Sequence, residues 1–457
     1  MKRKSEWNTK KKKRRAKANH DKGIVDFVKI LRHFFPELPV WINNMDDPRV
    51  QGYCIYTQAD YIMMGILKNI CGTKSMNNMD ENFNEQSCID NLRYLSGDSY
   101  LTEMPNKDSL TYYLKMLDPG QLAKVRKKMI QALIKRKNFD RARVSDSCWR
   151  IVLDGTGIHY YTEKPNENCL IERRKNPDGS ETVRYFNKVL EAKLILGDKL
   201  VMSIDTEFVE NESEDVPKQD CEINAARRLL DRIKEQYPRM PICVQGDALY
   251  AAESIMRQCR ENGWHYIFTM KESRQHTLGE CYEYIKFEGA DGWKDEICEE
   301  NGIGIYCNNV DEVAGKTEKA NIFEYEYTYT NKDEEDKKKH FCWLTDIPIH
   351  RHNLEEMIGF ARGRWKIENE GFNNQKNGIY DIEHLNSRNY NAIKNHYLIT
   401  QIADIIMQLY LAWSQVIKQT GQSIKNTSSR LLESFRRHTI NCEDAIWIEK
   451  RTSVYLE

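Results

Sequence analysis

Glu368 is an acidic residue on the apolar stripe of a predicted helix. The stripe is formed by residues at helical spacing: Leu354, Met357, Ile358, Ala361, Trp365 and Phe372. A carboxylate on the buried face of a helix is costly unless it is paired or coordinated, so Glu368 is a candidate metal ligand. Asp154 and Asp247 each end a short apolar run elsewhere in the chain. Three carboxylates that converge from separate elements are typical of the metal sites of nucleases.

Asp154, Asp247 and Glu368 together could bind the divalent cations that assist phosphodiester cleavage. This chemistry commonly uses two ions roughly 3.5 to 4 Å apart, one activating the nucleophile and one stabilising the leaving oxygen. Because the chain has no cluster of soft ligands, we expect two Mg²⁺ ions, with Mn²⁺ as a substitute. Each aspartate alone is more often a turn or cap residue. The order of all three on the expected elements favours the metal site.

The two aspartates are expected at the ends of strands. Residues 148–154 form a strand-like run that ends at Asp154, and residues 241–245 form another that continues into Asp247. If these strands are neighbours in one sheet, both carboxylates emerge at one edge, where the helix with Glu368 can cross. Between and beyond them the pattern predicts a polar loop at 162–180, a hairpin of 188–196 with 200–208 turning at Gly197 and Asp198, helices at 221–236 and 250–262, and a strand at 264–270.

The regions before this core differ from it in charge and in hydrophobic pattern. Residues 1–22 form a basic arm that we expect to be disordered, either contacting a polyanion or serving only as a solvated tail. Residues 23–145 predict an all-α domain, with a DNA-binding domain and a plain helical bundle fitting equally. Its expected helices are 59–70, 109–116 with Asp108 as N-cap, and the basic 121–137.

The C-terminal half combines a β-rich stretch with later helices. We divide the chain into the arm 1–22, the helical domain 23–145, a first catalytic core segment 146–275, a β insertion 276–349, a second catalytic core segment 350–420 and a helical tail 421–457. Within the second core segment, helices are expected at 354–376 and 392–417.

Composition excludes several classes of protein. The chain has 457 residues and a formal net charge of zero, an average that hides the basic arm. No apolar run is long enough to span a bilayer, and the start has no signal-peptide core. The 13 cysteines show no Cys-x-x-Cys pair or zinc spacing, so they read as reduced thiols. These features predict a soluble, cytosolic protein with no membrane partner.

The strings around the three acids resemble those of the DDE transposases of bacterial insertion sequences, in the group whose core is interrupted by a β insertion. The matching strings are Leu153-Asp154-Gly155-Thr156, Gln245-Gly246-Asp247-Ala248 and Arg364-Trp365-Lys366-Ile367-Glu368. The resemblance covers about residues 100 to 400. It implies an α/β fold: a ribonuclease-H-like mixed sheet with flanking helices, a β-rich insertion and an all-α N-terminal domain.

Two positions depart from the signature of that group. Ala361 stands where the group has a tyrosine, and Gln375 stands where it has a lysine, with Lys376 following. Lys376 can still reach the side of the helix that carries Glu368, so it remains a predicted DNA contact. Arg364, one turn before Glu368, is either a second DNA contact or half of an ordinary helix salt bridge.

The resemblance also implies a reaction and its partners. Trp343, in the insertion, is a candidate for stacking on a displaced base. The expected activity is metal-dependent cleavage and strand transfer of double-stranded DNA, at terminal inverted repeats and into target DNA, by a homodimer near the nucleoid. One alternative is a nuclease of the same fold without strand transfer. Another is a domesticated DNA-binding derivative, against which the presence of all three acids speaks.

Overall fold

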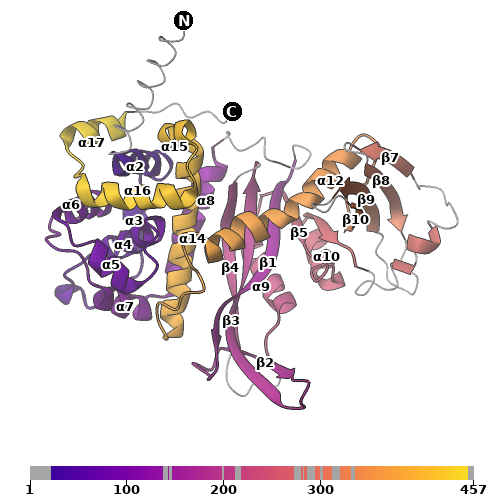
Figure 1. The fold of residues 1–457 in the computed structure, drawn as a ribbon, viewed down its shortest axis with the longest axis horizontal. Coiled ribbons are helices and arrows are strands. Elements are labelled where there is room, and N and C mark those ends of the chain that lie inside the picture. Colours follow the sequence, from indigo (N-terminus) through magenta and orange to yellow (C-terminus); the bar gives the residue numbers. More distant parts are fainter. Residues whose placement is uncertain are drawn as a thin grey trace, which may run out of the picture.

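The computed structural model describes residues 22–136, 143, 147–197, 200–211, 218–271, 279–280, 282–285, 294–298, 302–310, 320–330 and 335–450. The predicted basic arm lies outside the described residues except for Lys22. A central sheet lies between a helical region, built from both ends of the chain, and a β-rich end (Figure 1).

One mixed sheet of ten strands runs through the molecule. Its order is β2-β3-β1-β5-β6-β10-β9-β8-β7, and β4 pairs with β3. The strands are β1 (Trp149–Tyr161), β2 (Leu170–Lys175), β3 (Glu181–Leu196), β4 (Leu200–Val209), β5 (Ile242–Gly246), β6 (His265–Thr269), β7 (Lys294–Cys298), β8 (Gly302–Val310), β9 (Ala320–Thr330) and β10 (Asp336–Thr345).

β1 is the centre of the core. It pairs antiparallel with β3 and parallel with β5, which pairs parallel with β6. This is the predicted ribonuclease-H-like arrangement, and the expected fold class is confirmed. The register pairs Val152 with Gln245. Asp154 and Asp247 each follow that pair by two residues, so they lie at matching positions of neighbouring strands, as predicted. The expectation that the first strand ends at Asp154 is wrong, because β1 continues to Tyr161 by pairing with β3.

The stretch 162–180 is not only a loop. It contains β2, which pairs with the start of β3 and is mostly exposed beyond Ile171. Polar residues on a solvated edge strand give no apolar alternation, so the pattern concealed this strand. The predicted hairpin of β3 and β4 is present, and Gly197 adopts the left-handed conformation at its turn, with φ 63°.

The strands of the insertion extend the core sheet. β10 pairs antiparallel with β6, and β9, β8 and β7 follow it outward. The aromatic side chains Phe323, Phe341 and Trp343 stack on one face of this extension. The insertion is therefore continuous with the core through backbone hydrogen bonds.

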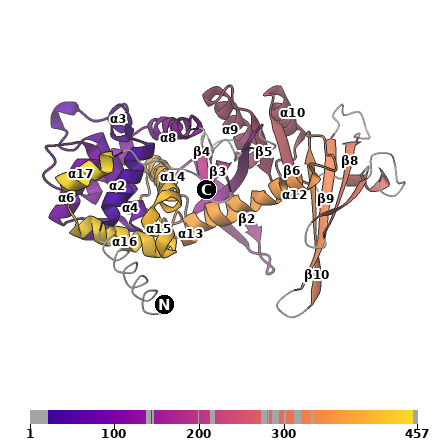
Figure 2. The same cartoon turned by 90° about the horizontal axis from the view of Figure 1, so that it is seen from above.

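Helices cover both faces of the core and form the region beside it. The first set is α2 (Gly23–Phe34), α3 (Leu38–Asn43), α4 (Gln58–Ile70), α5 (Met76–Asn82), α6 (Gln86–Ser96), α7 (Lys107–Met116) and α8 (Pro119–Ile134). The later set is α9 (Glu222–Gln236), α10 (Glu253–Glu261), α12 (Leu354–Arg362), α13 (Asn374–Asn377), α14 (Tyr390–Trp413), α15 (Gln415–Thr420), α16 (Ile424–Arg437) and α17 (Cys442–Glu449). In Figure 2, α9 and α10 lie on one face of the core sheet, and α12 and α13 lie on the other.

The cap predicted for α7 is two residues too late. Asn106, not Asp108, is the N-cap, and its side chain accepts a hydrogen bond from the N–H of Ser109. Asp108 lies in the first turn instead, where a carboxylate favours the helix dipole. Either residue type suits a cap, so the pattern alone could not fix the start of the helix.

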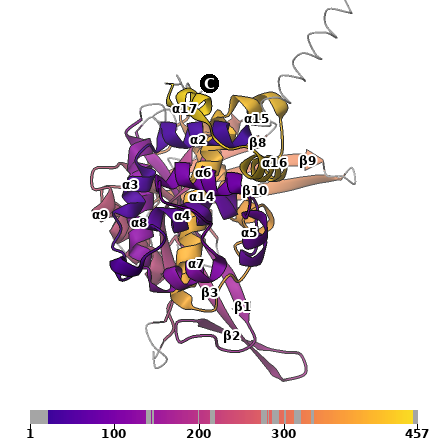
Figure 3. The ribbon, with the colours of Figure 1, turned by 90° about the vertical axis from the view of Figure 1, so that its left-hand side faces the viewer.

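α14 joins the helical region to the core. It contacts α2, α4, α7 and α8 on one side and β4 on the other. α16 packs on α2 and α6, and α17 packs on α2, so the two ends of the chain share one helical body (Figure 3).

Candidate active site

Asp154 is a mostly buried carboxylate in the middle of β1. One of its oxygens accepts a hydrogen bond from the N–H of Gly155 at 2.9 Å. Burial and the nearby charge of Glu368 raise the pKa of Asp154 to about 7, with a smaller contribution from Glu222 and an opposing one from Arg364. The charge of Glu368, which comes from a different element, therefore acts on Asp154.

Glu368 lies on an irregular segment rather than on one continuous helix. The predicted helix 354–376 is divided into α12, a 3₁₀ turn (Gly363–Trp365), a π-helical segment (Ile367–Asn373) and α13. Ile367 and Phe372, five residues apart, pack together on Val152 and Ile195 of the sheet. Five residues make about one π-helical turn, so these two side chains fix the segment against the strand that carries Asp154.

The predicted apolar stripe is wrong at two positions. Trp365 is 49% exposed, and the Glu368 side chain is 52% exposed. The change from 3₁₀ to π geometry shifts the helical phase, so neither side chain lies where a uniform helix would place it. Glu368 is held by Arg364, whose Nη1 lies 2.6 Å from its Oε1. The salt bridge considered as one alternative is therefore present.

Asp247 follows β5 directly and shapes the turn after it. Its Oδ1 accepts a hydrogen bond from the N–H of Leu249 at 2.8 Å, and its carbonyl accepts one from the N–H of Tyr250 at 3.1 Å. Burial and the charges of Glu222, Asp154 and Asp247 raise the pKa of the Tyr250 hydroxyl. Tyr250 thus lies within electrostatic reach of both aspartates.

Asp154 and Asp247 lie on neighbouring strands and the charge of Glu368 acts on Asp154, but the three predicted acids do not form a closed cage. Within the described parts of the chain, no three His, Cys, Asp or Glu side chains are close enough together to enclose a metal ion. Asp154 and Glu368 are coupled directly, whereas Asp247 is linked to Asp154 through Tyr250.

Sequence reasoning missed three residues beside these acids. Glu222, in the first turn of α9, accepts a hydrogen bond from the Tyr250 hydroxyl and forms an ion pair with Lys188 of β3. No motif marks them, since a carboxylate at a helix start is common. The available signal was Gly155: a Cβ at that position would lie 2.6 Å from the Glu222 carboxyl group, so a side chain there would move Glu222 from its present place.

Burial of position 375 explains why this chain has glutamine where the group signature has lysine. Gln375 is fully buried, and its Nε2 donates to Gln401 at 3.0 Å and to Asp404 at 2.8 Å. A lysine there would face the core rather than DNA. Lys376 is on the accessible side and forms an ion pair with Glu383 at 2.7 Å.

Trp343 does not lie open to a base. It is 4% exposed, and its ring stacks on Phe323 at 5.2 Å and on Phe341 at 5.5 Å between centroids. The prediction that it stacks on a displaced base therefore disagrees with this conformation, because the side chain is buried among neighbouring aromatic rings. The sequence could not distinguish a core tryptophan from an exposed one on an alternating strand.

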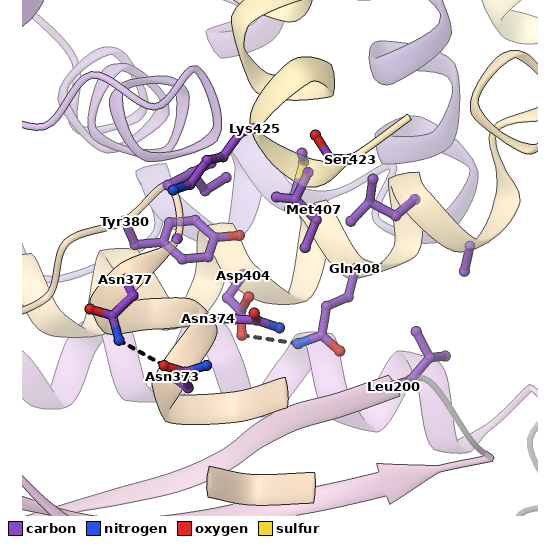
Figure 4. A pocket seen from close by; sticks show the side chains of 15 residues that line it. Leu200, Asn373, Asn374, Asn377, Tyr380, Asp404, Met407, Gln408, Ser423 and Lys425 are labelled. Carbon is purple, nitrogen blue, oxygen red and sulfur yellow. Dashed lines mark hydrogen bonds between the residues drawn. The ribbon is translucent and has the colours of Figure 1, made fainter. Parts of the chain in front are cut away.

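A cavity of about 590 Å³ lies farther along the same helical segment, between α13, α14 and the start of α16 (Figure 4). Amide side chains line part of it, and Asn377 donates to Asn373 at 2.7 Å. Its lining contains none of the three acids. The cavity is therefore distinct from the candidate active site.

Comparison with known proteins identifies the family. A model of the transposase DDE domain matches residues 149–403, which is more than half of the chain. The chain belongs to this family. The matched region runs from the first residue of β1 into α14 and includes all three predicted acids. Membership makes the protein a DDE transposase that binds DNA and carries out phosphodiester hydrolysis and transesterification, in a family that generally uses divalent metals.

Other comparisons are weaker. No curated protein sequence matches the chain. Among solved structures, the chain is similar to the piggyBac transposase in a cryo-EM synaptic complex with hairpin DNA, with 11% identity, a TM-score of 0.41, and coverage of 94% of this chain and 82% of that one. In the described residues, no helix is long and apolar enough to cross a membrane.

Proposed function

We propose that this DDE transposase mobilises a bacterial insertion sequence. It would bind the terminal inverted repeats, cleave to free a 3′ hydroxyl, and join that hydroxyl to target DNA. The observation that carries the proposal is the placement of Asp154 and Asp247 at matching positions of neighbouring strands, with Glu368 near enough that its charge, together with burial, raises the pKa of Asp154 to about 7. Two carboxylates that repel each other, one on β1 and one on the π-helical segment beside it, are suited to share a cation.

The donor set fits divalent magnesium. Asp154, Asp247 and Glu368 offer only carboxylate oxygens, the ligands that Mg²⁺ prefers. We assign these residues to hold two Mg²⁺ ions, with Mn²⁺ as a substitute. The ions would supply Lewis-acid activation of the attacking oxygen and neutralise charge on the leaving oxygen. Their charge would also remove the repulsion that disfavours ionised Asp154 beside Glu368.

The remaining side chains would orient the acids and the DNA. Arg364 would keep the half-exposed Glu368 within electrostatic reach of Asp154 through its salt bridge with Glu368. Lys376, whose ion pair with Glu383 is partly exposed, could exchange that carboxylate for a backbone phosphate. Phosphate contacts of this kind position DNA without reading its sequence.

End recognition belongs to the helical region in this proposal. Two element ends must be held together for transposition, so we expect a homodimer in the synaptic complex. The protein would act on the nucleoid in the cytoplasm of its host. The basic arm would add affinity for phosphate that is independent of sequence.

The test uses linear DNA that carries the sequences flanking the coding region. Metal-dependent cleavage at an inverted repeat, followed by joined products with a target plasmid, supports the proposal. Cleavage without joining would favour the nuclease, and binding without cleavage would favour the DNA-binding derivative. Full cleavage in excess chelator would exclude the metal mechanism.

A further inference from the structure

Glu222 connects β3 to the turn after β5, beside the predicted acids. Its Oε1 accepts a hydrogen bond from the Tyr250 hydroxyl, and its Oε2 forms an ion pair with Nζ of Lys188. Its side chain is only 12% exposed. Tyr250 belongs to the turn after β5 and Lys188 to β3, so one carboxylate links two regions of the core sheet on the face covered by α9 (Figure 2).

Two glycines beside the predicted acids make this contact possible. A Cβ on Gly155, the residue after Asp154, would lie 2.6 Å from the Glu222 carboxyl group. A Cβ on Gly246, the residue before Asp247, would lie 2.5 Å from the Tyr250 ring. Side chains at either position would therefore displace Glu222 or Tyr250.

We propose that Glu222 is a positioning residue that sets the spacing of Asp154 and Asp247. It rests against the backbone beside Asp154 and holds the Asp247 turn through the Tyr250 hydroxyl. The inference rests on the function proposed above, because it assigns the two aspartates to the metal site. Both oxygens of Glu222 already have partners, so its role is to orient the ligands rather than to join them.

Lys188 neutralises the negative charge of Glu222 through their ion pair. Without it, Glu222 would add a further uncompensated negative charge near Asp154. The ion pair allows a carboxylate to accept the Tyr250 hydrogen bond while the negative charge needed for cations stays with the ligands.

The experiment measures Mg²⁺ binding to the full-length protein by calorimetry, together with the Mg²⁺ concentration that gives half-maximal DNA cleavage. The variants are Glu222→Gln, Tyr250→Phe and their combination. Glu235→Gln, on the same helix, is the matched control. Each single variant should weaken Mg²⁺ binding about tenfold, as expected when an orienting partner of a ligand is lost. The double variant should lose less Mg²⁺ affinity than the sum of the two single losses, because both variants perturb the contact between Glu222 and the Tyr250 hydroxyl.

A second pair keeps the test decisive if Glu222→Gln fails to fold. Gly155→Ala should weaken Mg²⁺ binding, whereas Gly359→Ala should not, because a Cβ at Gly359 meets no atom within 4 Å. Loss of Mg²⁺ binding in Glu222→Gln equal to that in Asp154→Asn, with Tyr250→Phe and Gly155→Ala unchanged, would make Glu222 a ligand and overturn the proposal. Unchanged Mg²⁺ binding in Glu222→Gln, Tyr250→Phe and Gly155→Ala alike would also overturn the proposal. Asp154→Asn distinguishes failure of the positioning role of Glu222 from failure of the proposed function. Wild-type cleavage by the Asp154→Asn protein would contradict the proposed function itself.

Discussion

Glu368 is oriented by a charge and not by burial. Its side chain is 52% exposed, and the Arg364 guanidinium lies 2.6 Å from it. An exposed salt bridge contributes little to stability. The salt bridge instead fixes the position of the Glu368 carboxylate, which must remain within electrostatic reach of Asp154.

Replacing Glu368 with glutamine should abolish cleavage while the fold is retained. The amide has nearly the same shape, but it is a poor ligand for Mg²⁺, and an exposed position costs little to change. Glu355→Gln, at an exposed acid of α12, is the control and should keep wild-type activity. Cleavage assays and circular dichroism on both proteins check this, and near wild-type cleavage by folded Glu368→Gln protein would remove Glu368 from the site.

Two buried histidines should make stability depend on pH. His159 and His396 line a small polar cavity with Lys68. Burial lowers the pKa of His159 to about 4 and that of His396 to about 3, with a further contribution from nearby positive charge. Their pKa in the unfolded chain is about 6.5, so the unfolded state binds more protons between these values. The free energy of unfolding therefore falls as the pH falls below about 6.5.

The variant His396→Gln should reduce this dependence. At about 1.4 kcal/mol per pH unit, one such histidine costs up to about 2 kcal/mol between pH 6.5 and 5. Urea unfolding at pH 7 and pH 5 measures the difference for the wild type and for His396→Gln. An equal loss in both proteins would show that His396 is not the group that takes up the proton.

At the scale of elements, the π-helical segment determines where Glu368 lies. Ile367 and Phe372 anchor it on Val152 and Ile195. Phe372→Ala should therefore cost about 3 kcal/mol of stability and lower cleavage, because it removes a buried ring beneath the segment. Trp365→Ala should cost less than about 1 kcal/mol, since that ring is half exposed. Thermal unfolding of both variants distinguishes this arrangement from a uniform helix, in which the two losses would be similar.

The sequence predicted the strands of the core well and the helix phase badly. The apolar runs before Asp154 and Asp247 reflect burial of strands on both faces, a signal that is local. The end predicted for the first strand is wrong, since β1 continues past Asp154 to Tyr161. The phase at Trp365 depends on 3₁₀ and π turns that are stabilised by contact with Val152 and Ile195, which are distant in the sequence. For the same reason Glu222 was missed, since its partners Lys188 and Tyr250 become neighbours only in the folded sheet.

At the scale of the whole molecule, the ends of the chain share one helical body. The N–H of Ile24 donates to Ser434 Oγ at 2.9 Å, and Asn91 Nδ2 donates to the carbonyl of His438 at 2.8 Å. Leu431, Phe435 and Ile448 are buried in the core that these helices form.

Removing residues 423–457 should destabilise the helical region as a unit. Three buried side chains at about 1.5 to 3 kcal/mol each represent much of the stability of an ordinary domain. Limited proteolysis should then cut within α2 to α6, and the thermal transition should broaden. A chain shortened only to residue 450 is the control, and an unchanged melting curve for the longer deletion would contradict the shared core.

This packing also constrains how the protein is made. α2 is among the first helices to leave the ribosome, yet its partners α16 and α17 are synthesised about 400 residues later. Contacts with such sequence separation form late in folding, so the helical body stays incomplete until translation is nearly finished. A nascent or prematurely terminated chain would therefore lack a finished helical body, and chaperones would have to protect its apolar helices in the interval.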